Sequence, residues 1–225
     1  MKQLVRHAVK TAFHAVGLDI VRVKPDEKAK LLGLAAADIR TILDIGANAG
    51  QFARFARGVF PRAQIHSFEP LPAAFRELSA LATREGGGAM HAYNVAIGER
   101  EGIVPMWAKT DWHLSSSLLR STEEMHRHWP VTERQSRIDV ELTTLDKIVA
   151  REGIDAGRAL IKLDVQGYEA HALRGGPETM RRAHACLLEV NLDPLYGRGS
   201  RFEVLEECGP PGFRRRGRTA RRPTG

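Results

Sequence analysis

The stretch Ile42-Leu-Asp-Ile-Gly-Ala-Asn-Ala-Gly-Gln-Phe52 joins a short apolar run to a glycine-rich turn and the start of an amphipathic segment. Residues 41–45 predict a buried strand, and residues 51–59 predict a helix that follows the turn directly. Gly46 and Gly50 permit a tight turn and a close approach of the backbone to a ligand. The helix start behind them offers backbone N–H groups without partners inside the helix. The stretch therefore predicts a ligand-binding strand, turn and helix.

The spacing of the glycines distinguishes this turn from a dinucleotide-binding turn. A dinucleotide site has the pattern Gly-x-Gly-x-x-Gly and faces a pyrophosphate. The turn here is Gly-x-x-x-Gly, with Asp44 just before it. A carboxylate at that point repels a pyrophosphate and attracts an amino group, directly or through water. The turn thus favours a zwitterionic amino-acid cofactor, and an NAD-binding oxidoreductase remains the alternative enzymatic interpretation.

A second acidic residue stands at the end of the next predicted strand. Glu69 lies in the segment Ile65-His-Ser-Phe-Glu-Pro70, where Pro70 ends the strand. An acid in this position is the expected acceptor for two ribose hydroxyls. Together with the first turn, it predicts an adenosine-containing ligand at the carboxyl edge of a sheet. The following strand end, Tyr93-Asn-Val-Ala-Ile-Gly98, is in a position to border the adenine.

Further carboxylates follow two later strands. The segment Leu160-Ile-Lys-Leu-Asp-Val-Gln-Gly-Tyr-Glu169 delivers Asp164 to the sheet edge, and the next strand brings Glu189 and Asn191 to the same edge. Convergent carboxylates at strand ends usually mark a site rather than a need of the fold. We predict Asp164 and Glu189 as catalytic residues without deciding which is the base. His113, beside Trp112 in a long polar segment, is a further candidate base.

A metal ion is another means of acidifying a hydroxyl group. The oxygen atoms of Asp164, Glu189 and Asn191 suit Mg²⁺. We do not expect Mg²⁺ as a cofactor, however, and we assign no metal ligand. The chain has no cysteine and histidine cluster with the spacing of a zinc site.

Strands and helices alternate from residue 41 onward, and this order predicts an α/β fold. We expect a mostly parallel, twisted sheet with helices on both faces. Residues 110–137 have no clear period and predict a loop or lid. We divide the chain into three segments: an N-terminal helix and lead-in at 1–40, the ligand-binding domain at 41–207 and a basic tail at 208–225. The expected strands are 41–45, 64–68, 89–95, 103–108, 138–142, 159–163 and 185–190, and the expected helices are 51–59, 72–84, 145–152 and 168–174.

The composition narrows the possible partners and the compartment. The 225 residues, 43% of them hydrophobic, suit one compact domain. We expect no membrane span and no signal peptide, and the two cysteines predict free thiols in the cytoplasm. The net charge of +7 comes almost entirely from six arginines in residues 208–225. Residues 1–207 are thus nearly neutral. A module that binds nucleic acid through the arginine-rich tail is therefore only the third interpretation, and we expect no nucleic-acid partner.

The ordered set of motifs resembles the FkbM-like family of S-adenosylmethionine-dependent methyltransferases. The resemblance implies a class I, Rossmann-like methyltransferase fold and S-adenosylmethionine as the cofactor. It also implies O-methylation of a hydroxyl on a sugar, a glycan or a small natural product. The matching stretches are Asp44-Ile-Gly-Ala-Asn-Ala-Gly50, Ser67-Phe-Glu-Pro70, Asn94-Val-Ala-Ile-Gly98, Ser115-Ser-Ser-Leu118, Thr144-Leu-Asp146, Ile161-Lys-Leu-Asp-Val-Gln-Gly-Tyr-Glu169 and Leu195-Tyr196.

The resemblance also implies roles for individual residues. The first turn would hold the methionine part of the cofactor, Glu69 the ribose and residues 94–96 the adenine, with Asp164 near the methyl group. A class I fold ordinarily ends with two further strands, and we expect these to be missing because residues 209–225 have no apolar alternation. The oligomeric state is not predicted. The predicted cofactor-binding residues are Asp44, Gly46, Ala47, Asn48, Gly50, Phe52, Glu69, Pro70, Asn94, Val95, Ala96 and Asp164.

Overall fold

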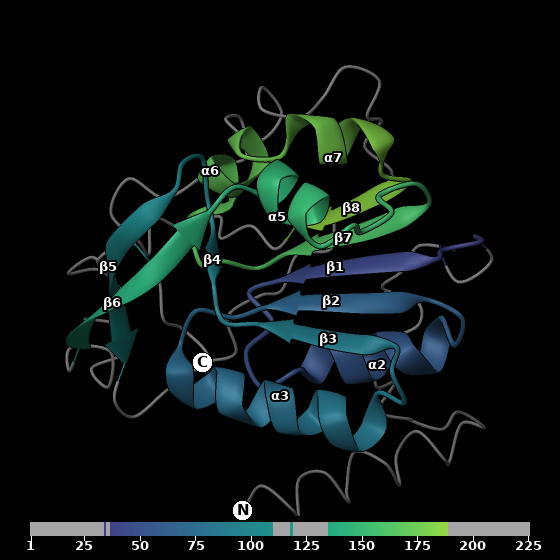
Figure 1. The fold of residues 1–225 in the computed structure, drawn as a ribbon, viewed down its shortest axis with the longest axis horizontal. Helices are drawn as coiled ribbons and strands as arrows, with labels where there is room; N and C mark the ends of the chain where they lie inside the picture. The colour runs from purple at the N-terminus through teal and green to yellow at the C-terminus, as the bar shows by residue number, and fades with distance from the viewer. Residues whose placement is uncertain (1–33, 35–36, 110–117, 119–134, 189–225) are drawn as a thin grey trace, which may run out of the picture. The chain divides into compact units, whose positions relative to one another are not determined.

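The computed structural model describes residue 34, residues 37–109, residue 118 and residues 135–188. The helices and strands given below lie in one compact unit, Ala36–Arg215 (Figure 1). The predicted N-terminal helix, the basic tail and the missing last strands concern residues outside the described ranges, so these expectations stay predictions, as does the cytoplasmic location. Within the described ranges, no helix is both long enough and apolar enough to cross a bilayer.

The main sheet has five parallel strands in the order β3-β2-β1-β7-β8. The strand β1 lies at the centre, and the chain leaves it toward β2 on one side and later returns as β7 on the other. The gap between the ends of β1 and β7 is therefore a topological switch point, where open α/β sheets bind ligands. The strands are β1 (Thr41–Ile45), β2 (Gln64–Phe68), β3 (Met90–Tyr93), β7 (Ala159–Leu163) and β8 (Ala185–Leu188).

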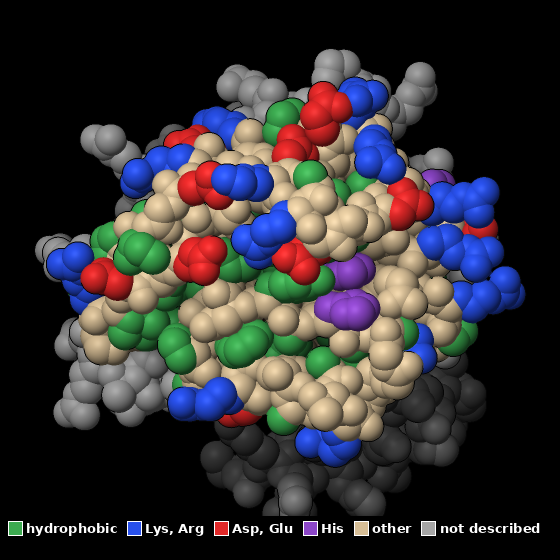
Figure 2. Space-filling view, viewed as in Figure 1, with side chains coloured by type: hydrophobic (Ala, Val, Ile, Leu, Met, Phe, Trp, Pro, Cys, Tyr) green, Lys and Arg blue, Asp and Glu red, His purple; other side chains and the backbone are tan. Residues whose placement is uncertain are grey.

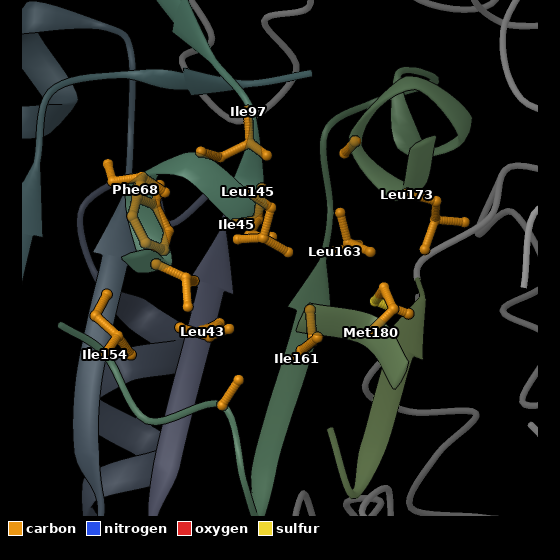
Figure 3. Packing of buried hydrophobic residues seen from close by; sticks show 14 of the residues in the cluster. Leu43, Ile45, Phe68, Ile97, Leu145, Ile154, Ile161, Leu163, Leu173 and Met180 are labelled. Atoms are coloured by element: carbon orange, nitrogen blue, oxygen red, sulfur yellow. The ribbon is translucent and has the colours of Figure 1, made fainter. Parts of the chain in front are cut away.

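Helices cover both faces of this sheet, as the sequence predicted. Alternate residues of a strand face opposite sides, so Leu43 and Ile45 of β1 pack with Leu145 and Met180 on one face (Figure 3). The other face, toward α2 and α3, holds Asp44. The helix α7 was not predicted from the sequence. The helices are α2 (Gln51–Val59), α3 (Pro72–Glu85), α5 (Leu145–Arg151), α6 (Glu169–Arg174) and α7 (Pro177–Arg182).

A second sheet, in the order β4-β6-β5, lies beyond the carboxyl ends of β1, β2 and β3 (Figure 1). Its buried face packs against Leu71 and Ala74 at the start of α3 and against Tyr168. The sequence predicted strands at 103–108 and 138–142 but no separate sheet. The predicted loop at 110–137 is also wrong at its end, because residues 135–137 pair with β5 in β6. The strands are β4 (Ala96–Ile97), β5 (Gly102–Lys109) and β6 (Gln135–Thr143).

The Thr144-Leu-Asp146 stretch joins two helices on one face of the main sheet. The hydroxyl of Thr144 accepts a hydrogen bond from the Lys147 N–H and so caps α5. The carboxylate of Asp146 accepts the N–H groups of Glu178 at 3.0 Å and Thr179 at 2.7 Å, in the first turn of α7. Since Gly176 at the N-cap has no side-chain acceptor, Asp146 supplies the cap for α7 from a different helix.

Replacing Asp146 by alanine should lower the free energy of unfolding by about 1 kcal/mol, because two N–H groups of α7 lose their acceptor. Urea denaturation measures this difference. The control is Glu178→Gln, which removes only an exposed ion pair with Arg181 in the same helix and should change stability much less. Equal effects of the two substitutions would contradict the capping role of Asp146.

A stack of rings lies on β2 and β3. The rings of His66 and His91 are stacked with their centroids 4.8 Å apart, and His66 Nδ1 lies 3.1 Å from the Tyr93 hydroxyl oxygen. Figure 2, which has the same view as Figure 1, shows histidine side chains next to one another over β2 and β3. Burial, with a smaller contribution from His91, lowers the pKa of His66 from 6.5 to about 4. The folded protein therefore favours the neutral ring.

The pKa of His66 makes stability depend on pH in a definite direction. The unfolded chain takes up a proton near pH 6.5 and the folded chain only near pH 4, so stability is present above pH 6.5 and is lost as the pH falls through this window. His66→Phe should remove a slope of at most about 1.4 kcal/mol per pH unit in urea denaturation. Tyr93→Phe keeps the histidine and should keep the slope; a slope unchanged in His66→Phe would contradict this assignment.

Candidate functional site

The turn between β1 and α2 has three residues in the left-handed region of backbone space. The φ angles are 76° at Gly46, 50° at Asn48 and 87° at Gly50. A Cβ atom on Gly46 would lie 2.0 Å from the carbonyl oxygen of Asp164. Only glycine therefore lets the turn sit directly against the end of β7. This contact places the first predicted motif beside the fourth, at the switch point of the sheet.

The backbone N–H groups of this turn are engaged within the protein. All five, from Gly46 to Gly50, donate hydrogen bonds to oxygen atoms of this chain. The acceptors are the Phe68 carbonyl, which takes two, the Glu69 carboxylate, the Asn48 side chain and the Ala47 carbonyl. A pyrophosphate cradle needs such groups directed at the ligand. The turn itself therefore lacks the feature on which an NAD site depends.

Glu69 ties the first turn to the end of β2. One carboxylate oxygen accepts the Asn48 N–H at 2.8 Å, and the other accepts the Leu71 N–H at 2.8 Å. The residue is buried, and burial raises the pKa of its carboxyl while the two backbone hydrogen bonds oppose that rise. Each oxygen has capacity for one more hydrogen bond. The geometry thus leaves the predicted ribose contact available and adds a second task, holding two loops together.

The third predicted segment contributes backbone contacts and buried apolar groups. The side-chain amide of Asn94 donates to the carbonyl oxygens of Glu69 at 2.9 Å and Pro70 at 3.0 Å. Val95 and Ala96 are buried in two separate hydrophobic clusters. Asn94 therefore supports the loop that carries Glu69. The role of residues 94–96 beside an adenine stays a prediction.

A buried ion pair joins β1 to β7. Asp44 is 0% exposed, and Lys162 occupies the paired position on β7. The ammonium nitrogen lies 3.2 Å from Asp44 Oδ1 and donates to the carbonyl oxygen of Gly46 at 2.8 Å. It also lies 5.8 Å from the centre of the Phe52 ring. Burial raises the pKa of Asp44, and Lys162 opposes that rise.

The carboxylate of Asp44 has unused hydrogen-bonding capacity. The Lys162 ammonium lies at ion-pair distance from Oδ1, and neither oxygen of Asp44 accepts a hydrogen bond from any other described residue. Buried carboxylate oxygens normally accept hydrogen bonds. Both oxygens of Asp44 therefore keep hydrogen-bonding capacity that the described residues do not fill.

Asp164 lies at the end of β7, next to the ion pair. Its side chain is 26% exposed, and one carboxylate oxygen lies 3.7 Å from the Lys162 ammonium. The other accepts the Gln166 side-chain amide at 2.7 Å. The following loop is held by Glu169, whose carboxylate accepts the N–H groups of Val165 and Gly167. Burial raises the pKa of Glu169, and these bonds oppose the rise.

The structure brings together three of the predicted charged residues, Asp44, Glu69 and Asp164, around the first turn. Glu189, Asn191 and His113 lie outside the described residues, so their predicted roles and the Mg²⁺ hypothesis stay predictions, as does the catalytic role of Asp164. Within the described part of the chain, no group of three or more histidine, cysteine, aspartate or glutamate residues has the arrangement of a metal site.

The sequence interpretation assigned no role to Lys162 and Glu169. A lysine inside the apolar strand Leu160-Ile-Lys-Leu163 was a usable indication, because a buried ammonium needs a partner. Glu169 had no comparable indication, because its hydrogen bonds depend on the left-handed conformations of Gln166 and Gly167.

Comparisons with known proteins agree with the sequence motifs. Residues 44–209 match the model of the methyltransferase FkbM domain. The 2-O-methyltransferase NoeI of Sinorhizobium fredii is 32% identical over 69% of this chain and 65% of its own length. The 31-O-demethyl-FK506 methyltransferase FkbM of Streptomyces tacrolimicus is 28% identical over 75% of each chain. The chain thus spans slightly less than two thirds of NoeI.

A comparison with solved structures gives a partial match. The methyltransferase FkbM from Methylobacillus flagellatus KT superimposes with a TM-score of 0.42 and 17% sequence identity. The match covers 64% of this chain and 30% of that one.

Gly46→Ala should destabilise the protein by more than the backbone strain alone, which costs on the order of 1 kcal/mol. The added methyl group also collides with the Asp164 carbonyl, a backbone group directly after β7 that cannot turn aside as a side chain can. Gly88→Ala is the matched control, because Gly88 has a similar φ of 81° and open space around its Cβ position. Thermal or urea unfolding compares the two, and equal losses would show that the contact between the turn and β7 contributes nothing.

Proposed function

Since the chain belongs to the FkbM methyltransferase domain family, we propose that it is an S-adenosylmethionine-dependent O-methyltransferase. The acceptor is a hydroxyl group of a sugar, a glycan or a small natural product. Two relatives, a 2-O-methyltransferase and a 31-O-demethyl-FK506 methyltransferase, support methylation at oxygen.

The observation that carries this proposal is the electrostatic character of the first turn. Its five N–H groups are engaged within the protein, and the two carboxylates beside it, Asp44 and Asp164, share a single ammonium, that of Lys162, so the charges next to the turn sum to a negative value. This arrangement repels a pyrophosphate and suits the ammonium group of an amino acid. The unfilled hydrogen-bonding capacity of Asp44 fits such a group, reached directly or through one water molecule.

Different residues of the site bind different parts of the cofactor. Asp44 and the turn from Gly46 to Gly50 hold the amino-acid end, and Glu69 holds the ribose hydroxyls through the free capacity of its oriented carboxylate. The N-cap of α2 is Gly50, which brings no side-chain acceptor to the first turn of that helix. The N–H groups there suit the cofactor's carboxylate. When bound, S-adenosylmethionine supplies a methyl group on a positively charged sulfur atom.

The acceptor hydroxyl needs a group that takes its proton as the new bond forms. Asp164 is the described residue best placed for this, because its side chain is partly exposed at the switch point and fixed by Gln166. A positioned base contributes roughly 10²–10⁴-fold to such a reaction. Glu189, on the following segment of the chain, is the second candidate.

Calorimetry with S-adenosylhomocysteine, NAD and RNA, each titrated separately into the protein, tests the proposed class of ligand. We expect binding of S-adenosylhomocysteine alone. Asp44→Asn and Glu69→Gln should each weaken that binding by roughly tenfold or more, since each removes a charge that contacts or orients the ligand. Glu178→Gln, a carboxylate on the exposed surface of α7, is the control and should bind normally.

Two results would contradict the proposed function. One is failure of the wild type to bind S-adenosylhomocysteine, with or without tight binding of NAD, which contradicts the class of cofactor. The other is normal binding of S-adenosylhomocysteine by both site variants, which contradicts the binding roles given to Asp44 and Glu69. The acceptor is identified by incubating the protein with radiolabelled S-adenosylmethionine and fractionated metabolites and glycans.

A further inference from the structure

Lys162 is an unusual residue for its position in the fold. It lies in the interior of β7, whose five residues are all buried, and its own side chain is only 11% exposed. A buried ammonium costs several kcal/mol of desolvation unless it is well paired. Leu160, two residues earlier on the same face of β7, shows what the strand otherwise uses there. The buried ammonium of Lys162 therefore indicates a specific structural or functional role.

The contacts of Lys162 indicate what that task is. Its ammonium donates to the carbonyl oxygen of Gly46 and lies within ion-pair distance of both Asp44 and Asp164. One side chain therefore links the end of β1, the first residue of the turn and the end of β7. The carbonyl of Asp164 also lies directly against Gly46, so any relaxation of this contact displaces both loops.

We propose that Lys162 is a positioning residue of the cofactor site, whose ammonium fixes the Gly46 turn by holding the Asp44 carboxylate and the Gly46 carbonyl together. This inference rests on the proposed function for the identity of the ligand. Lys162 acts through Asp44 and the turn. Without its ammonium, the turn loses a hydrogen bond and Asp44 loses its counter-ion in a buried setting.

A double-mutant cycle tests this inference with the full chain. The variants are Lys162→Met, Asp44→Asn and the double variant, and the two readouts are urea unfolding and calorimetric affinity for S-adenosylhomocysteine. Each single variant should bind S-adenosylhomocysteine at least about tenfold more weakly than the wild type does. The double variant should bind about as weakly as one single variant, because residues that act as a pair are not additive. It should also be more stable than Lys162→Met, since it leaves no uncompensated carboxylate.

A purely structural role predicts a different pattern. In that case Lys162→Met, measured under conditions where it stays folded, is less stable than the wild type but binds S-adenosylhomocysteine with wild-type affinity, and that result would overturn the proposal. Full additivity of the two losses, about a hundredfold together, would do the same. If Lys162→Met does not fold, the affinity of the double variant is compared with that of Asp44→Asn. A further loss of less than twofold supports the proposal, and any larger further loss overturns it.

A matched control and the wild type separate this inference from the proposed function. Lys147→Met removes an exposed lysine that pairs with Glu101, and it should leave affinity unchanged. A wild-type protein that fails to bind S-adenosylhomocysteine would refute the proposed function itself. Normal wild-type binding that Lys162→Met leaves unaffected would refute only the role of Lys162.

Discussion

A buried ion pair holds the carboxyl edge of the sheet together at its switch point. Asp44 and Lys162 occupy paired positions on β1 and β7, and the ammonium also binds the carbonyl of Gly46. An unpaired charge in this setting costs several kcal/mol, so each residue depends on the other. The glycine turn, the start of α2 and the end of β7 take their positions from this contact. The site is therefore built around a charge that the protein has already partly compensated.

Two further buried carboxylates, those of Glu69 and Glu169, hold the neighbouring loops in place. Glu69 binds N–H groups from the first and second strand ends, and Glu169 binds N–H groups from the loop after β7. Both are buried carboxylates that satisfy the backbone. Loops held in this way are ordered before a ligand arrives, which lowers the entropy lost on binding. The acidic residues at this edge thus serve the fold as well as the site.

Much of this arrangement follows from local sequence patterns, and the remainder depends on contacts between distant residues. The strands at 41–45 and 64–68 and the helix at 51–59 have the predicted bounds, because apolar runs there end at Gly or Pro. The second sheet was missed because β4 has only two residues and β5 pairs with β6 across a long interval. Strand ends located Asp44 and Asp164, but only the register of β1 against β7 places Lys162 opposite Asp44.

The most direct measurement is a crystal structure of this chain with S-adenosylhomocysteine bound. We predict that the amino-acid end of the ligand lies on the Gly46 turn, that the ribose hydroxyls lie at Glu69, and that the Lys162 ammonium stays between Asp44 and the Gly46 carbonyl. A nucleoside bound elsewhere on the chain, or a Lys162 side chain turned away from the Gly46 carbonyl in that complex, would contradict it.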